Sequence, residues 1–172
     1  KTNDYLTKAP SFVSNVLWKM MQGNGDSLPV SAMPNDGTYP SGTTKWEKRR
    51  ISEQVAQWNP GICIQCGNCS FVCPHAVIRS KFFHESSLDG APVGFNSAPI
   101  NAKGFPETRY SLQVYLEDCT GCNLCYEVCP VTDPADRTKK AINIEEMPVD
   151  LTESLAAMAF FEAIPWNEKS ED

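Results

Sequence analysis

Apolar residues recur at helical spacing near both ends of the chain. In residues 10–23 apolar side chains occupy positions i, i+3, i+4, i+7 and i+8, and Gly23 follows them. The segment that starts at Asp150 opens with a capping-box pattern, continues as LAAMAFFEA and stops at Pro165. We therefore predict a helix in each segment, and we expect residues 46–58 to be helical in part.

Strand patterns lie between these two segments and are shorter. Apolar and polar residues alternate over RYSLQVYLED, residues 109–118, which predicts a strand. The apolar runs AVI at 76–78 and AINI at 141–144 predict two further short strands. The turn-rich segment 26–44 shows no period, so we expect it to lie extended over a surface, and residues 89–106 have the composition of a loop.

One pattern occurs twice in the chain. C-x-x-C-x-x-C-x-x-x-C-P stands at residues 63–74 and again at 119–130. Each copy has a lead-in before it and a short apolar run after it. This repetition predicts a duplicated unit with pseudo-two-fold symmetry.

Charge and hydropathy argue against two classes of partner. The formal net charge of −6 and the sequence pI of about 4.9 argue against a nucleic-acid binder. No apolar run approaches the roughly 20 residues that a membrane span needs. Two basic runs, residues 45–50 and 137–140, are interpreted as solvated surface, with a docking patch for an acidic carrier as the alternative. No secretory leader is visible, and the start at Lys1 indicates processing or excision from a longer chain, of which we favour excision.

All eight cysteines lie in the two motifs. Clustered cysteines without a secretory signal favour metal ligation in a reducing cytoplasm over a disulfide framework. A zinc ion is coordinated by four ligands at the corners of one tetrahedron, which usually come from two C-x-x-C pairs far apart in the sequence. In such a site the middle cysteine of a triple would have no ligand position. A loop that offers a thiolate every third residue suits the separate iron corners of a cubane, and this spacing is that of bacterial ferredoxins.

The motifs therefore predict two 4Fe-4S clusters. In two-cluster ferredoxins the fourth cysteine of each run ligates the other cluster, because the chain has already turned away from the first one. The ligands predicted for cluster one are Cys63, Cys66, Cys69 and Cys129. The ligands predicted for cluster two are Cys119, Cys122, Cys125 and Cys73.

Neighbouring residues are expected to support the clusters. Pro74 and Pro130 should begin a helix after each motif, and Gly67 and Gly121 should let the backbone approach cluster sulfide. His75 is expected to make a structural hydrogen bond. Apolar neighbours are expected to form a dry shell: Ile62, Ile64, Phe71, Val72, Val77, Ile78, Leu124, Tyr126, Val128, Ile142 and Ile144.

The expected fold class is α+β, a bacterial two-cluster (2×4Fe-4S) ferredoxin-like domain with N- and C-terminal extensions. An N-terminal helix and extended arm would occupy residues 1–57. The two-cluster domain would occupy residues 58–147, with an inserted loop at 79–108, and a helical tail would occupy residues 148–172.

The sequence shows no phosphate-binding glycine loop, dinucleotide fingerprint, nucleophile elbow or thiamine diphosphate signature. We therefore expect an electron carrier without catalytic activity of its own. The alternative is a structural or docking module, in which metal only holds loops together.

Beyond the cysteines, three segments resemble the pyruvate:ferredoxin (flavodoxin) oxidoreductase family. They are GDSLPVSAMPNDGTYPSGTTKWEKR (25–49), WNPGICIQCGNCSFVCPHAVIR (58–79) and SLQVYLEDCTGCNLCYEVCP (111–130). The first segment makes the resemblance specific, because ferredoxins at large do not share it. The resemblance implies the two-cluster domain of a much longer chain, although a separate small subunit is a further reading.

The resemblance also implies a route for electrons. In that family thiamine diphosphate, in other domains, decarboxylates pyruvate in a coenzyme-A-dependent reaction. Electrons then pass to a further 4Fe-4S cluster and through the medial and distal clusters, whose ligands would be the eight cysteines here, to ferredoxin or flavodoxin. The expected partners are thus this acceptor and the other domains of the parent enzyme, in the cytoplasm and in anaerobic metabolism.

Overall fold

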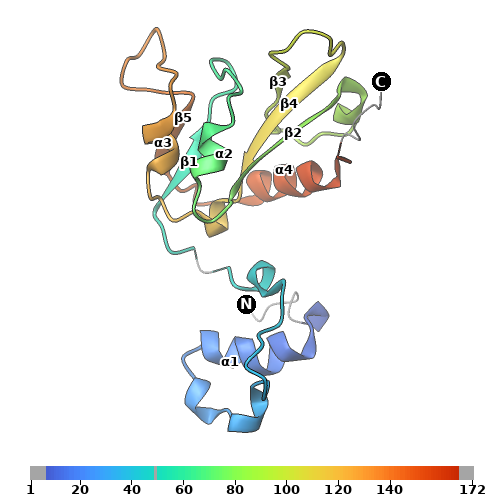
Figure 1. The fold of residues 1–172 in the computed structure, drawn as a ribbon, viewed down its shortest axis with the longest axis vertical. Coiled ribbons are helices and arrows are strands. Elements are labelled where there is room, and N and C mark those ends of the chain that lie inside the picture. The colour runs from blue at the N-terminus through green and yellow to red at the C-terminus, as the bar shows by residue number, and fades with distance from the viewer. Residues whose placement is uncertain (1–6, 49, 167–172) are drawn as a thin grey trace. The chain divides into compact units, whose positions relative to one another are not determined.

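The computed structural model describes residues 7–48 and 50–166 (Figure 1). It divides into two compact units, residues 1–49 and 50–172. Arg49, which belongs to the first basic run, lies outside the described residues. Within the described ranges, none of the helices combines the length and the apolar character that crossing a membrane requires.

The first unit is built around one helical segment. A π-helical turn, Val13–Leu17, runs directly into α1 (Trp18–Met21), and Val13, Val16 and Leu17 are buried. This confirms the helix predicted for residues 10–23. The turn-rich segment that follows contains 3₁₀ turns at Gly25–Ser27, Val30–Ala32 and Thr43–Trp46. The ring of Tyr39 packs edge-on against Phe12, with ring centroids 5.2 Å apart, so this segment folds back onto the helical segment.

The second unit contains two antiparallel sheets. The two-stranded sheet pairs β1 (Gln54–Trp58) with β5 (Ile142–Glu146). The three-stranded sheet has the order β2-β4-β3, with β2 (Ile78–His84), β4 (Thr108–Val114) and β3 (Ala98–Pro99). The strands predicted at 109–118 and 141–144 are confirmed as β4 and β5. Of the strand predicted at 76–78 only Ile78 is in a strand, and this strand, β2, continues to His84 through the start of the segment expected to be an inserted loop.

The partial helix expected in residues 46–58 is wrong: among the described residues of this segment only Trp46, at the end of a 3₁₀ turn, is helical, and Gln54–Trp58 form β1. Local residue preferences favour a helix there. In the structure, however, the segment is held in the core, where the side chains of Val55 and Ala56 are only 0% and 1% exposed. Trp58 pairs with Ile142, and Gln54 pairs with Glu146. Pairing with a strand from the far end of the unit therefore outweighs a weak local propensity.

The core of the second unit includes part of the cysteine set. Val55, Ile78, Leu112 and Ile142 are buried together with Cys119 and Cys125. Cys69, Cys73 and Cys129 are partly buried against the same cluster. The thiols therefore lie within the packed interior rather than on a detached loop.

Helix α4 (Thr152–Ala163) confirms the helix predicted after Asp150. The Oδ1 atom of Asp150 accepts a hydrogen bond from the backbone N–H of Thr152 at 2.9 Å. Figure 1 shows α4 running along the β2–β4 pair. The Nζ atom of Lys81, on β2, donates to the carbonyl oxygens of Phe161 at 2.8 Å and Ile164 at 2.5 Å at the helix end. The tail is thus packed on this unit.

Candidate metal centre

Each cysteine motif forms a loop whose backbone turns in the same way. Gln65 and Gly121 occupy equivalent places and have φ values of 60° and 63°. Gly67 and Asn123 are likewise equivalent, with φ values of 76° and 68°. Left-handed residues reverse the direction of the chain within a few bonds. The cysteines between them are consequently held on the inside of a tight curl in both motifs.

A short helix follows inside each motif, not after it as predicted from the prolines. These helices are α2 (Asn68–Val72) and α3 (Leu124–Val128). Cys73 and Cys129 end them with extended backbones, at ψ 113° and 119°. A residue before proline is disfavoured in helical conformation, so Pro74 and Pro130 end these helices rather than begin new ones.

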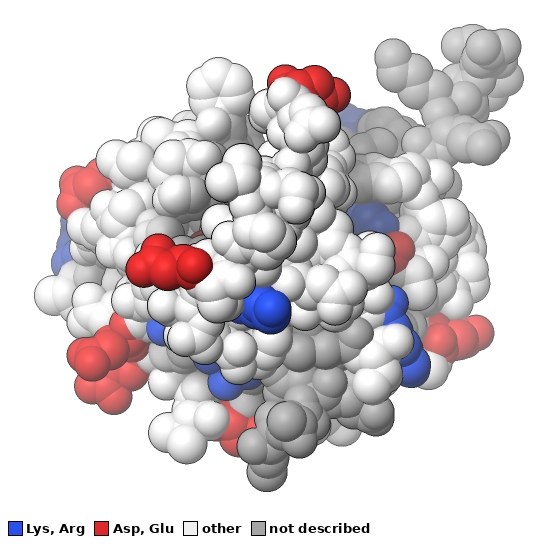
Figure 2. All heavy atoms as spheres, turned by 90° about the horizontal axis from the view of Figure 1, so that it is seen from below, with Lys and Arg blue, Asp and Glu red and all other residues white. Residues whose placement is uncertain are grey.

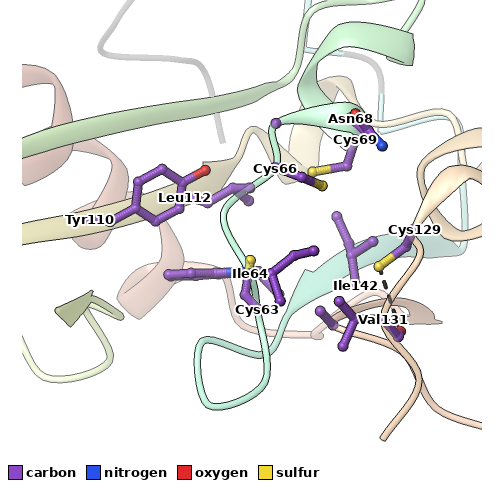
Figure 3. Close-up of a pocket in the computed structure, with 13 residues that line it drawn as sticks. Cys63, Ile64, Cys66, Asn68, Cys69, Tyr110, Leu112, Cys129, Val131 and Ile142 are labelled. Carbon is purple, nitrogen blue, oxygen red and sulfur yellow. Dashed lines mark hydrogen bonds between the residues drawn. The ribbon is translucent and has the colours of Figure 1, made fainter. Parts of the chain in front are cut away.

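The first of two cavities is lined by the thiols of Cys63, Cys66, Cys69 and Cys129. Cys69 lies on α2, and Cys129 follows α3, so both motifs contribute (Figure 3). The open space of this cavity is about 350 Å³. Its other walls are largely apolar and include Trp58, Ile64, Tyr110, Leu112, Val131 and Ile142.

The second cavity is lined by Cys73, Cys119, Cys122 and Cys125. Its open space is about 310 Å³, and its apolar walls are Ala56, Val77, Ile78 and Ile144. The first three cysteines of each motif therefore share a cavity with the fourth cysteine of the other motif. His75 lies exposed at this second cavity, rather than satisfied within the core as expected.

The β1–β5 sheet forms a common floor for both cavities. Trp58 and its partner Ile142 line the first cavity, while Ala56 and its partner Ile144 line the second. Alternate residues of a strand point to the same face of a sheet. The two cavities consequently lie beside each other over one face.

Burial and the neighbouring thiols disfavour negative charge in these cavities. Burial, and to a smaller extent electrostatic repulsion by the neighbouring Cys63, Cys66 and Cys129, raises the pKa of Cys69 to about 11. Burial also raises the pKa of Cys125 to about 11, with contributions from Cys119, Cys69 and Cys122. Metal ligation needs the thiolate, so a bound group here must carry enough positive charge to displace these protons. Cys69 of one set contributes to the raised pKa of Cys125 in the other set, and α2 contacts α3, so the two thiol sets are close neighbours.

The four thiols of each cavity can be compared with what a zinc ion and a cubane require. Among the described residues, no three His, Cys, Asp or Glu side chains come close enough together to bind a single ion. A zinc ion needs four ligands within about 2.3 Å of one centre. A cubane instead spreads its ligands over four iron atoms. The donor set of each cavity, four thiols in an apolar pocket, therefore fits an iron–sulfur cluster.

Backbone N–H groups already point at several of the sulfur atoms. The N–H of Gln65 donates to the Sγ of Cys63 at 3.3 Å. The backbone N–H groups of Ser70 and Tyr126 interact with Cys69 and Cys125, and each lowers the pKa of that thiol against the larger effect of burial. Such bonds stabilise negative charge on sulfur, which is one way a protein sets a cluster potential.

Two residues in or beside the first cavity, Trp58 and Gln65, were not singled out from the sequence. Trp58 lies five residues before the first cysteine, and its position on β1 brings it to the thiols. The side-chain amide of Gln65 bonds to the carbonyl oxygen of Pro99 and the N–H of Asn101, both at 2.7 Å. These bonds hold part of the inserted loop beside the first motif. No pattern in the sequence marks either contact.

The expected dry shell is only partly confirmed. Val77, Ile78 and Ile142 are buried, but Phe71 is 95% exposed. Ile64, Leu124 and Val128 are also exposed. Helices α2 and α3 have only five residues each, so their sides opposite the cysteines face outward. The apolar residues on those sides therefore contribute surface rather than shielding.

Gly121 is required for a close backbone contact, which differs from the role expected for it. A Cβ atom at Gly121 would lie 2.7 Å from the carbonyl oxygen of Gln54 and 2.5 Å from the Oγ of Ser52. A Cβ atom at Gly67 would meet nothing within 4 Å. Gly121 therefore lets the second motif pack against the start of β1, whereas Gly67 is needed only for its left-handed backbone.

These two glycines give a matched pair of substitutions. Gly121→Ala is expected to lower the free energy of unfolding by roughly 3 kcal/mol, because strain and overpacking add. Gly67→Ala carries only the left-handed strain and should cost about 1 kcal/mol. Guanidinium unfolding of both variants under anaerobic conditions measures the difference. Equal losses would show that the contact with Gln54 does not limit this position.

Some residues of the two basic runs already form ion pairs or hydrogen bonds within the chain. Arg50 forms an ion pair with Glu117 at 2.8 Å. The Nζ atom of Lys140 donates to the carbonyl oxygen of Tyr126 at 2.9 Å, at the end of α3. On the face drawn in Figure 2, the Lys and Arg side chains are scattered among acidic and uncharged ones. The docking patch for an acidic carrier stays a prediction.

Comparison with protein families divides the chain near the boundary between its two structural units. Residues 1–52 match a family described as a domain of unknown function. Residues 62–132 match a family described as a 4Fe-4S double cluster binding domain. The second match contains both cysteine motifs.

Comparison with individual proteins extends over most of the chain. A pyruvate-flavodoxin oxidoreductase of Trichormus variabilis is 46% identical over 163 residues, which is 94% of this chain and 14% of that protein. A probable pyruvate-flavodoxin oxidoreductase of Escherichia coli is 42% identical over 95% of this chain and 14% of its own length. A pyruvate:ferredoxin oxidoreductase of Moorella thermoacetica is 44% identical over 73% of this chain and 11% of its own length.

These relatives are much longer than the chain, which spans about a seventh of their length. The similarity nevertheless includes the segments that suggested the family from the sequence alone, and it confirms that resemblance. The chain is therefore a homologue of one segment of the pyruvate-flavodoxin oxidoreductases, and this segment contains a 4Fe-4S double cluster binding domain.

Proposed function

We propose that the chain is an electron-transfer module that holds two low-potential 4Fe-4S clusters. Cluster one would be held by Cys63, Cys66, Cys69 and Cys129. Cluster two would be held by Cys119, Cys122, Cys125 and Cys73. The observation that carries this proposal is the division of the eight thiols into two adjacent apolar cavities of four, with the fourth cysteines exchanged.

The two halves support a pseudo-two-fold arrangement of the domain. A strand, a curled cysteine loop and a short helix follow one another in both, as β1 and α2 and again as β4 and α3. The strand before each motif pairs with the strand after the other, β1 with β5 and β4 with β2. This pairing is what a duplicated ferredoxin-like unit would produce.

When bound, each cluster would take up and return one electron without breaking bonds in the protein. The protein would supply thiolate ligands, apolar walls and N–H donors. Because Cys69 and Cys125 are close neighbours, electrons could pass between the clusters over a short path across the α2–α3 contact.

The place of the module in a larger reaction follows from its relatives. We infer that electrons come from the oxidative decarboxylation of pyruvate, carried out with thiamine diphosphate and a further 4Fe-4S cluster in other domains of a parent enzyme. Ferredoxin or flavodoxin would accept them, in the cytoplasm of an organism with anaerobic metabolism. The names of the relatives support pyruvate as the source of the electrons and flavodoxin or ferredoxin as their acceptor.

Anaerobic reconstitution of the chain tests the proposal directly. The protein should bind about eight iron atoms and take up about one electron per cluster. The EPR spectrum of the reduced protein should show two magnetically interacting clusters, because the cavities adjoin. An iron content near four, or none, would contradict the two-cluster assignment.

A structural or docking role is the second candidate, and the exposed apolar residues favour it. Phe71 on α2 and Val149 before α4 are fully or almost fully exposed. In a docking role these residues would contact other parts of a longer chain. Docking and electron transfer are compatible. Bound iron that cannot be reversibly reduced would leave docking as the function.

A further inference from the structure

Trp58 carries a buried hydrogen-bond donor without a partner. In the part of the chain that the structure describes, its Nε1 atom is shielded from solvent and bonded to no acceptor. An unpaired buried donor costs about 1–3 kcal/mol, and native structures pair nearly all such groups. The position of Trp58 therefore calls for an acceptor that the surrounding side chains do not provide.

The walls around Trp58 restrict what this acceptor can be. Trp58 lines the first cavity beside the four thiols, and the remaining walls around it are largely apolar. The ring of Tyr110 packs against the indole at a centroid distance of 5.9 Å, and its hydroxyl is engaged with Ser80. Asn68 also lines the cavity, but Nε1 bonds to neither its amide oxygen nor the Tyr110 hydroxyl. The acceptors that remain among the lining side chains are the sulfur atoms of the thiolates and of the group they hold.

The second cavity differs at the corresponding place on the sheet. Ala56 points from the same face of β1 into that cavity, and its side chain has no donor. The two cavities therefore have equal thiol sets but unequal floors, an indole in one and a methyl group in the other.

We propose that the indole N–H of Trp58 donates a hydrogen bond to a sulfur atom of the cluster in the first cavity and raises the reduction potential of this cluster. This rests on the proposed function. Reduction adds negative charge to the cluster, so a donor at its sulfur stabilises the reduced form more than the oxidised form. Trp58 therefore tunes the reduction potential of cluster one and leaves that of cluster two unaffected.

Two replacements of Trp58 separate the hydrogen bond from the shape of the ring. Trp58→Phe removes the N–H and part of the ring. Replacement of Trp58 with 3-benzothienylalanine keeps the bicyclic shape and exchanges only the N–H for sulfur. Both variants of the full chain are reconstituted anaerobically, and each cluster is titrated by EPR. The signal of cluster one is identified as the one lost in Cys66→Ala, whose thiol lines the first cavity. The same isostere at Trp18, in α1 of the first unit, is the matched control.

We expect both Trp58 variants to make cluster one about tenfold harder to reduce at a fixed ambient potential, which is about 59 mV for a one-electron couple. Cluster two and the Trp18 control should not change. An unchanged potential of cluster one in the isostere would overturn the proposal and would indicate buried water as the partner of Nε1. A shift of both clusters would overturn it too, because a general loosening of the fold would be the cause. Failure of the unsubstituted chain to bind about eight irons would instead refute the proposed function.

Discussion

Cys73→Ala is expected to eliminate cluster two and to leave cluster one in place, although Cys73 belongs to the first motif. The thiol of Cys73 shares its cavity with Cys119, Cys122 and Cys125, all from the second motif. Without it, one iron atom of cluster two has no protein ligand, and we expect the four-iron cluster to be lost. The iron content should fall from about eight towards about four, and the EPR features that arise from interaction between the clusters should vanish.

Cys129→Ala provides the matched control, because this thiol occupies the equivalent place in the other cavity. It should eliminate cluster one and retain the signal that Cys73→Ala loses. Two variants that lose the same signal would refute the exchange of ligands. Cys66→Ala, whose thiol lines the first cavity, identifies the signal of the cluster held by the first motif. If Cys73→Ala lost the same signal as Cys66→Ala, each motif would hold its own cluster.

Lys81→Met is expected to detach the C-terminal helix from the sheet. The ammonium group of Lys81 is buried and donates to the carbonyl oxygens of Phe161, Glu162 and Ile164. These carbonyls lie at or next to the C-terminal end of α4, where the helix dipole favours a positive charge. Hydrogen bonds to a charged group are each worth about 1.5–3 kcal/mol. The variant should therefore lose about 3 kcal/mol of stability in this region.

Hydrogen exchange of the α4 amides measures this loss locally. Lys103→Met is a suitable control, since Lys103 is exposed in the inserted loop and its replacement should change stability by less than about 0.5 kcal/mol. Protection of α4 that is the same in both variants would show that the apolar face of the helix holds it without Lys81. Met158 and Phe161 are the buried residues that would then be responsible.

The elements that local patterns predicted well are those whose pattern is complete within one segment. In the helix at residues 10–23 the apolar positions follow the helical period closely enough to exclude a strand. In β4 they follow the strand period closely enough to exclude a helix. The segment of β1 lacks such a pattern, and its neighbours favour a helix. It became a strand because β5 supplies hydrogen bonds and because Val55 and Ala56 are buried by other segments. A single stretch of sequence contains no information about such a partner.

The exposure of Phe71 likewise could not be predicted from one stretch of sequence. Its position between two cysteines suggested shielding of the site, yet a five-residue helix turns it outward. The sequence shows that Phe71 is apolar but not which side of so short a helix meets the core. Contacts with residues outside this chain would explain why an apolar side chain stands there.

The sequence by itself determined the chemistry of the candidate site. The residue types and their spacing specify thiolate ligands on two tight loops, because the spacing of donors along a loop is a local property of the chain. Only the tertiary structure decided which segments meet at each cavity. It placed Trp58 beside one thiol set and Ala56 beside the other, brought Gly121 against Gln54, and buried Lys81 at the end of α4. The contacts of Ala56, Gly121 and Lys81 join residues that are distant in the sequence, so packing of the whole unit selects them. Trp58 is near the first motif in the sequence, but the pairing of β1 with β5 is what places it beside the thiols.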